Sequence, residues 1–245
     1  MKLRKYSFLI FLGISLIPLI SYGHDVTSAD KVILMNNGIP GYIYVGAKHM
    51  LTGYDHILFL VGVIFYLNNF KDILKFITVF TIGHSITLIG ATYVGVTANE
   101  YLIDSVIALS VLYKGFENLD GFQKFFKIKS SNLLLMVFVF GLIHGFGLSA
   151  RLQSFDIGEA YLLLKTASFN IGVELGQILA LIPIVFLISK WRKYKSYGIF
   201  YRVTNVFLVV AGVLLFSYQI YGYFNPDTHH SHDHEHVHEG HDHSH

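Results

Sequence analysis

The sequence predicts an all-α protein built as a bundle of transmembrane helices. Apolar runs of about 20 residues recur along the chain, the length at which a helix crosses the ~30 Å hydrocarbon layer of a bilayer. Of the 245 residues, 53% are hydrophobic and only 14% charged, and the mean hydropathy is +0.52. Because backbone polar groups find no water inside lipid, segments of this kind must be helical. We therefore expect one helical domain embedded in a membrane.

The composition excludes several classes of function. The formal net charge is only +2 with neutral histidines, so the broad basic surface that binds nucleic acid is not expected. The chain has no cysteine and only four methionines, which argues against disulfides and against soft ligation of Cu(I). No Walker motif is present, so ATP hydrolysis by that route is not expected. Any metal would meet nitrogen and oxygen ligands.

The first 23 residues have the pattern of a signal peptide. Lys2, Arg4 and Lys5 precede an apolar stretch, and the segment ends in a small, variable, small triplet closing at Gly23. Cleavage there would make His24 the first residue, whose free amine and imidazole form a potential metal chelate. An uncleaved N-terminal helix is the alternative.

Six membrane spans are predicted after this segment. They lie near residues 45–68, 73–95, 100–119, 131–150, 160–189 and 201–223. Lys and Arg gather in alternate loops, and the positive-inside rule places those loops in the cytoplasm. Both ends of the mature chain then lie outside, as expected for a multi-pass protein of the bacterial inner membrane. The expected organisation is a signal peptide (1–23), an extracytoplasmic segment (24–42), a transmembrane domain (43–224) and an extracytoplasmic tail (225–245).

The tail reads NPDTHHSHDHEHVHEGHDHSH and is expected to be disordered, because it has too few apolar residues to bury a core. An affinity tag is the alternative, but tags are usually homopolymers, whereas carboxylates are interleaved with these histidines. Imidazole and carboxylate together suit divalent Zn, Ni, Co and Cu. The tail therefore predicts metal capture by His229, His230, His232, His234, His236, His238, His241, His243 and His245.

Imidazoles and carboxylates recur inside the predicted spans, where an acid or base at the helix centre costs about 2.5 to 3.5 kcal/mol. His49 and His56 are seven residues apart, which predicts one face of the first span, with Asp55 beside them. His84 lies near mid-membrane in the second span. His144 lies in the fourth, among glycines that allow close helix approach or a local break. One such residue often only bonds a neighbouring helix, but the whole set indicates a metal pathway.

Further polar residues extend this pattern. Asn170, Glu174 and Gln177 form a stripe on the fifth span, and Asp104 and Glu117 lie near opposite ends of the third. Glu174 is a candidate ligand. The other four residues are expected to hydrogen-bond to ligands and orient them, or to line the pathway: Asn170, Gln177, Asp104 and Glu117. The expected metal ligands are His24, His49, Asp55, His56, His84, His144 and Glu174.

With these residues, the chain resembles the HupE/UreJ family over residues 41–222, especially its second branch. The resemblance rests on His49 followed by Asp55-His56, and on the phrases GHSITL, ALS followed by EN, GLIHGFG and FNIGVELGQ. It implies a nickel or cobalt permease that serves the maturation of nickel hydrogenases or ureases. Arg151 departs from the nickel-permease branch, which has glutamate six residues beyond the glycine of its His-Gly motif. Glu174 is a candidate replacement for that carboxylate.

We therefore expect transport of a divalent metal ion, nickel or cobalt and alternatively zinc, as substrate and not as the cofactor of an enzyme. One alternative is an intramembrane zinc hydrolase, in which three histidines and a carboxylate hold a metal-bound water that attacks a lipid amide or ester. The predicted spans contain no HExxH or nucleophile-elbow motif that would support it. The other alternative is a membrane-anchored metal buffer or sensor, which needs the tail but not the buried histidines.

Overall fold

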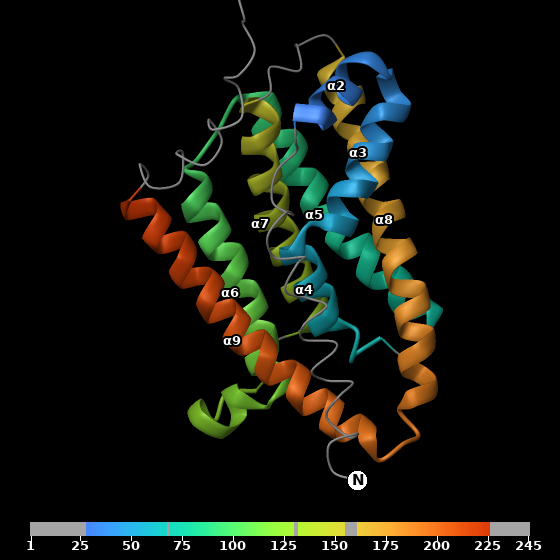
Figure 1. Cartoon of the computed structure of the whole chain (residues 1–245), viewed down its shortest axis with the longest axis vertical. Coiled ribbons are helices and arrows are strands. Elements are labelled where there is room, and N and C mark those ends of the chain that lie inside the picture. The colour runs from blue at the N-terminus through green and yellow to red at the C-terminus, as the bar shows by residue number, and fades with distance from the viewer. Residues whose placement is uncertain (1–27, 68, 130–131, 155–160, 226–245) are drawn as a thin grey trace, which may run out of the picture.

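The computed structural model describes residues 28–67, 69–129, 132–154 and 161–225, without the side chains of Ser28, Tyr54, Asp55 and Ser154. Every regular element in these ranges is helical, as predicted (Figure 1). The elements are α2 (Ser28–Asn36), α3 (Gly38–Thr52), α4 (Tyr54–Val63), α5 (Phe70–Val94), α6 (Glu100–Asn118), the π-helix η2 (Phe122–Phe126), α7 (Leu133–Ser154), α8 (Leu162–Trp191) and α9 (Ser196–Phe224). The predicted signal peptide, His24 and the tail histidines lie outside the described residues.

Four helices of the described chain, α5, α7, α8 and α9, are long and apolar enough to cross a membrane. They correspond to the second, fourth, fifth and sixth predicted spans. Helix α6 occupies the third, but Asp104, Lys114 and Glu117 make it less apolar than the other four. The protein is thus a multi-pass helical bundle, in which the charged side chains of α6 need partners within the protein.

The first predicted span is not one continuous helix, so the expectation of a single helix over residues 45–68 was wrong. Gly53 adopts an extended conformation (φ −65°, ψ 110°) and separates α3 from α4. Its N–H donates to the His49 carbonyl at 2.8 Å, and its own carbonyl accepts from the Ile57 N–H at 3.0 Å. These bonds satisfy backbone groups at the break, as a membrane interior requires.

The turn that follows α4 is held by the side chain of Arg192, the residue directly after α8. The Arg192 guanidinium donates to the carbonyls of Phe65 and Leu67, at 2.9 and 3.0 Å. These carbonyls belong to residues just after α4, so the bonds fix the turn that follows the helix and place a cation beyond the C-terminal end of its dipole. Short helix α4 is therefore held at both ends.

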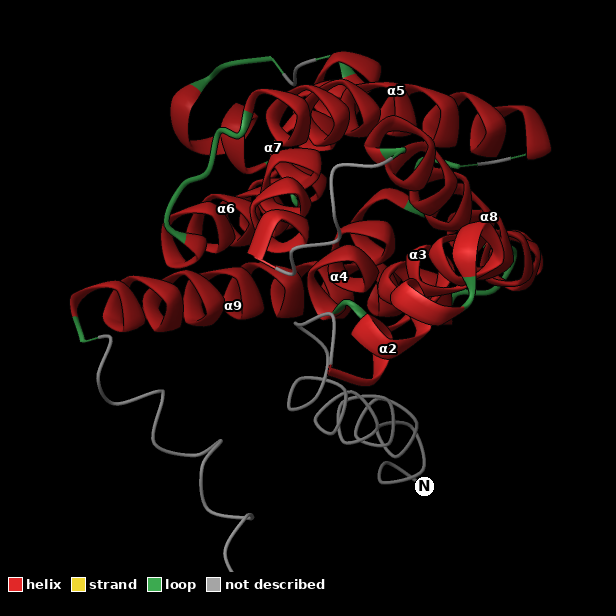
Figure 2. Ribbon diagram, turned by 90° about the horizontal axis from the view of Figure 1, so that it is seen from above, coloured by secondary structure: helices red, strands yellow, loops and turns green. Residues whose placement is uncertain are grey.

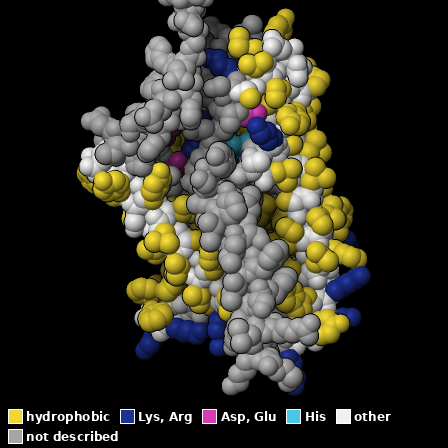
Figure 3. All heavy atoms as spheres, in the orientation of Figure 1, with side chains coloured by type: hydrophobic (Ala, Val, Ile, Leu, Met, Phe, Trp, Pro, Cys, Tyr) yellow, Lys and Arg dark blue, Asp and Glu magenta, His cyan; other side chains and the backbone are white. Residues whose placement is uncertain are grey.

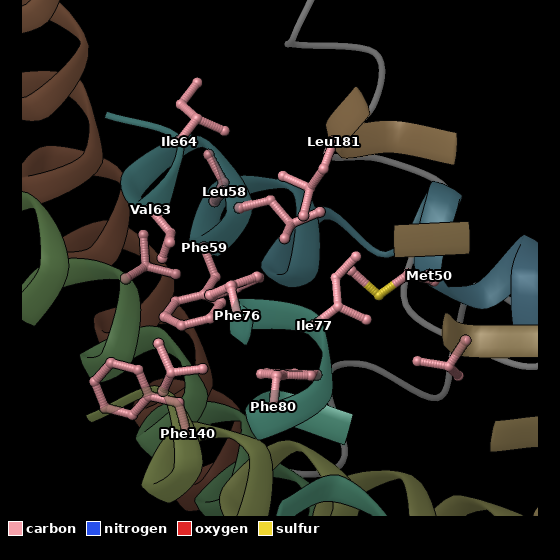
Figure 4. Packing of buried hydrophobic residues seen from close by; sticks show 14 of the residues in the cluster. Met50, Leu58, Phe59, Val63, Ile64, Phe76, Ile77, Phe80, Phe140 and Leu181 are labelled. Atoms are coloured by element: carbon pink, nitrogen blue, oxygen red, sulfur yellow. The ribbon is translucent and has the colours of Figure 1, made fainter. Parts of the chain in front are cut away.

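The long helices pack in three pairs, α3 with α8, α5 with α7, and α6 with α9. Viewed from above, the three pairs lie on three sides of α4 (Figure 2). Phe59 of α4 marks this central position, because its ring contacts Phe76 and Phe80 of α5 and Phe140 of α7 (Figure 4). The hydrophobic core is thus organised around the short helix.

Glycines bring the paired backbones together. A Cβ on Gly46 of α3 would lie 2.1 Å from the Phe169 carbonyl oxygen of α8, and one on Gly172 would lie 2.0 Å from that of Ile43. Between α5 and α7, a Cβ on Gly145 would lie 2.2 Å from the His84 carbonyl oxygen. Small residues are the usual means of close helix packing in membranes, where no hydrophobic force holds helices together.

The outer surface has the distribution expected of a protein in a bilayer. Large apolar side chains such as Leu179, Phe186 and Leu214 are exposed. In the view of Figure 3, apolar side chains cover much of the described surface and Lys and Arg gather at the lower end. In Figure 1 that end contains η2 and the connection between α8 and α9.

Substituting Gly46 by alanine should weaken the α3–α8 pair, because the added methyl has no room beside the Phe169 carbonyl. Overpacking of this kind costs about 1 to 3 kcal/mol. Thermal unfolding of the purified protein in detergent measures the effect. Gly90→Ala in α5 is the matched control, since nothing lies within 4 Å of its added Cβ. An equal melting temperature for both variants would contradict the close packing.

Candidate functional site

Three imidazoles form a row at the centre of the bundle. His49 comes from α3, His56 from α4 and His144 from α7. The ring centroids of His49 and His56 are 4.9 Å apart and those of His56 and His144 4.8 Å apart, each pair in edge-to-face contact. The three side chains are 9%, 3% and 1% exposed. The row therefore joins the α3–α8 pair to the α5–α7 pair through α4.

The break at Gly53 changes how this row is built. We predicted that His49 and His56 share one face of a continuous helix, but they lie on two helices separated by the extended residue. Their rings still meet, because α4 continues into the centre of the bundle. In α7, where glycines around His144 raised the possibility of a break, the helix is continuous.

The fourth predicted histidine, His84 of α5, lies beside this row and is fully buried. Its ring stacks on Phe80 at 5.9 Å, and the Phe80 ring contacts His144 at 5.6 Å. Its Nδ1 lies 2.9 Å from Oδ1 of Asn170 on α8. All four histidines predicted within the spans thus lie in the interior of one bundle.

Aromatic side chains surround the imidazoles. Phe59 and Phe80 contact His144, at 5.8 and 5.6 Å between ring centroids, and Phe169 contacts His49 at 5.9 Å. Phe59, Phe80 and Phe169 are each almost fully buried. Such a shell limits water around the rings and strengthens any electrostatic interaction there.

The polar stripe of α8 divides between two environments. Asn170 and Gln177 are buried, whereas Glu174 between them is partly exposed. The side chain of Asp55 lies outside the described residues. Among the described side chains, no group of three or more histidines and carboxylates is arranged so that it could hold one metal ion. In this conformation the imidazoles meet in pairs.

Asp104, predicted to line the pathway, forms a buried ion pair with Arg151 across α6 and α7. Nη2 of Arg151 lies 2.6 Å from Oδ2 of Asp104, and Nε2 of Gln219 on α9 donates to the same oxygen at 3.4 Å. Arg151 is the residue that departs from the nickel-permease motif. Its positive charge has a structural role here, which is to balance the carboxylate of the neighbouring helix.

Glu117, predicted near the cytoplasmic end, also has an internal cation. Nζ of Lys114 lies 2.7 Å from its carboxylate and 3.8 Å from the centroid of the Tyr66 ring. The next residue, Asn118, donates its amide to Oδ1 of Asn205 on α9 at 2.5 Å. A buried polar cluster therefore connects α6 to α9 and to the segment after α4.

Several residues that pair with Asp104, Glu117 and Asn118 were not predicted from the sequence. Lys114 was given no partner, although its charge lies three residues before Glu117 inside a predicted span, a spacing that favours pairing. Asn205 was detectable as an amide in an otherwise apolar span, but its partner is 87 residues away in sequence. Arg151 was noticed as a departure from a motif, and spacing gave no indication of its contact with Asp104.

Replacing Arg151 by methionine should destabilise the bundle more than replacing both members of the pair. The single substitution leaves Asp104 buried without its guanidinium, which costs about 3 to 5 kcal/mol, whereas neutral replacement of a whole buried pair is often tolerated. A double-mutant cycle of Arg151→Met and Asp104→Asn, followed by SDS titration, measures the coupling. Lys124→Met breaks an exposed pair with Asp120 and should leave unfolding unchanged. Additive effects at Asp104 and Arg151 would contradict the pairing.

Comparison with known proteins assigns the chain to a family. Comparisons with curated proteins and with solved structures find no match. The family model described as HupE / UreJ protein matches residues 26–226, a range that includes all the described helices. This confirms the resemblance inferred from the histidine motifs. The family is one of transporters and not of enzymes, and it implies a membrane protein that transports nickel or cobalt. The chain belongs to the HupE/UreJ family.

Proposed function

We propose that this protein moves nickel or cobalt ions across the bacterial inner membrane by passing them between buried imidazoles. The observation that carries the proposal is the row of His49, His56 and His144, which joins three helices at the centre of the bundle. Packing alone does not require imidazoles in such a place, and polar side chains inside membranes commonly mark ion pathways. Membership of the HupE/UreJ family supports nickel or cobalt as the metal and transport as the function.

The chemistry of the row suits a transported ion. Neutral imidazole nitrogen is a good ligand for nickel and cobalt, and a metal–nitrogen bond is about 2 Å long. Neighbouring rings whose centroids lie 4.8 to 4.9 Å apart can therefore share an ion in pairs after small rotations. His56 contacts both of the others, so it is the natural point of transfer. A few weak ligands at a time allow the ion to leave again.

Orientation follows from the charge distribution. The end of the bundle where Lys and Arg gather is assigned to the cytoplasm by the positive-inside rule (Figure 3). The tail and His24 then lie outside, where they raise the local metal concentration. Asp104 and Glu117 line the outer and inner approaches, each neutralised by its own cation until a metal ion competes for the carboxylate.

Alanine at both His49 and His56 should abolish uptake of radioactive nickel or cobalt into vesicles of known sidedness, because it removes two consecutive ligands of the row. Protein level in the membrane is measured alongside. Phe169→Leu is the control, since it removes a ring that packs on His49 but no metal ligand. Uptake equal to that of the native protein in the double variant would rule out these histidines as the pathway. Lipid turnover with tightly held zinc would favour the hydrolase instead.

Deleting residues 229–245 separates transport from buffering. If the tail only captures metal for the pathway, the shortened protein should transport normally at high metal concentration and lose uptake at low concentration. The measurement is the concentration dependence of uptake for the full and shortened chains. Loss of all metal accumulation at every concentration would favour a membrane-anchored buffer, and the tail would then be the functional part.

A further inference from the structure

We infer that Asn170 and Ser85 position His84 by fixing its tautomer, so that Nδ1 carries the ring proton and Nε2 is the atom offered to the metal. The inference deepens the proposed function and rests on it for the identity of the ligand that Nε2 receives. It assigns a role to a chain of hydrogen bonds that links Ser85 of α5 to Asn170 of α8, and Asn170 to the imidazole of His84 on α5. Each member of the chain has a defined number of protons to give.

The chain begins at a backbone carbonyl. Oγ of Ser85 lies 2.6 Å from the carbonyl oxygen of Thr81, one turn earlier in α5. A carbonyl oxygen only accepts, so the single hydroxyl proton of Ser85 is used in this bond. Toward any other partner, the serine oxygen is an acceptor.

The second step fixes the orientation of the Asn170 amide. Its Nδ2 donates to Oγ of Ser85, and this bond places Oδ1 on the side of His84. The opposite orientation would set the amide oxygen against a serine oxygen that has no proton left to give. Proton counting thus supports the assignment of nitrogen and oxygen in this amide.

The third step fixes the imidazole. Oδ1 of Asn170 lies 2.9 Å from Nδ1 of His84, and an amide oxygen only accepts. Nδ1 must therefore be protonated, and in a neutral imidazole Nε2 then carries the lone pair. Metal-binding histidines commonly donate their second ring N–H to an oxygen in this way, which orients the ring and raises its basicity.

The lone pair that results has no hydrogen-bond partner in the described structure. Nε2 of His84 is among the buried side-chain atoms without one, and the side chain is 0% exposed. Leaving a buried acceptor unsatisfied is unfavourable. A metal ion accepting electrons from Nε2 would remove that cost, and the Phe80 ring, which stacks on His84 and contacts His144, places His84 beside the imidazole row.

The tautomer can be measured directly. In ¹⁵N-histidine-labelled full-length protein in lipid, free of metal, the His84 signals are those lost in His84→Gln. We expect a protonated Nδ1 and an unprotonated Nε2. Asn170→Leu and Ser85→Ala should shift the signals toward a tautomer mixture, whereas Asn170→Asp, which keeps an acceptor for Nδ1, should retain the native pattern. A proton on Nε2 in the native protein would overturn the inference.

Transport provides the second measurement. Asn170→Leu should raise the cobalt concentration for half-maximal uptake about 10- to 100-fold, the usual effect of removing the partner of a metal-binding histidine. Asn170→Asp should restore much of it. Thr92→Val is the matched control, because it breaks a buried side-chain bond to Ser149 between α5 and α7 without touching the chain of Asn170.

The two proposals fail differently. A native protein with the expected tautomer but no cobalt uptake would refute the transport function and leave the positioning of His84 intact. Native uptake that is unchanged in Asn170→Leu and Ser85→Ala would refute the positioning role and leave transport intact. If Asn170→Leu fails to fold, Ser85→Ala and Asn170→Asp decide the matter, since each keeps a polar group between α5 and α8.

Discussion

The structure depends on one constraint, that backbone groups and charged side chains in the interior of a membrane protein must find their partners within the protein. The buried polar groups are accordingly gathered into clusters and not scattered. Asp104 with Arg151, and Glu117 with Lys114, neutralise charge on α6. Because the first of these pairs joins α6 to α7, it also fixes how these two helices pack.

The same constraint explains how a broken helix can lie at the centre of the bundle. Gly53 interrupts the helix, but its own N–H bonds to α3 and its carbonyl accepts from α4, so the residue at the break is satisfied by both helices. Arg192 bonds carbonyls beyond the far end of α4. With both ends held, α4 can be short enough to fit among three helix pairs, and His56 then lies between the imidazoles of α3 and α7.

Much of this was predictable from sequence, but only where the signal is local. Long apolar runs predicted α5, α7, α8 and α9, and the cost of burying imidazoles predicted that the histidines face inward. The break at Gly53 was not predictable, because a single glycine in an apolar run is compatible with a continuous helix. The pairing of Asp104 with Arg151 joins residues 47 apart and depends on which helices become neighbours. No spacing rule contains that information.

Under the proposed function, the distribution of charge has a consequence for how an ion is admitted. The imidazole row offers neutral ligands, so a divalent ion among them would bring uncompensated charge into a region of low dielectric. Carboxylates lie along the same helix, α6, but Arg151 and Lys114 already occupy them. A metal ion that displaced one of these tethered cations would gain a carboxylate, while the arginine or lysine moved toward another acceptor. The two ion pairs thus keep the interior neutral when no metal is present. Exchange of one cation for another then limits the electrostatic free energy needed to bring a metal ion into the low-dielectric interior.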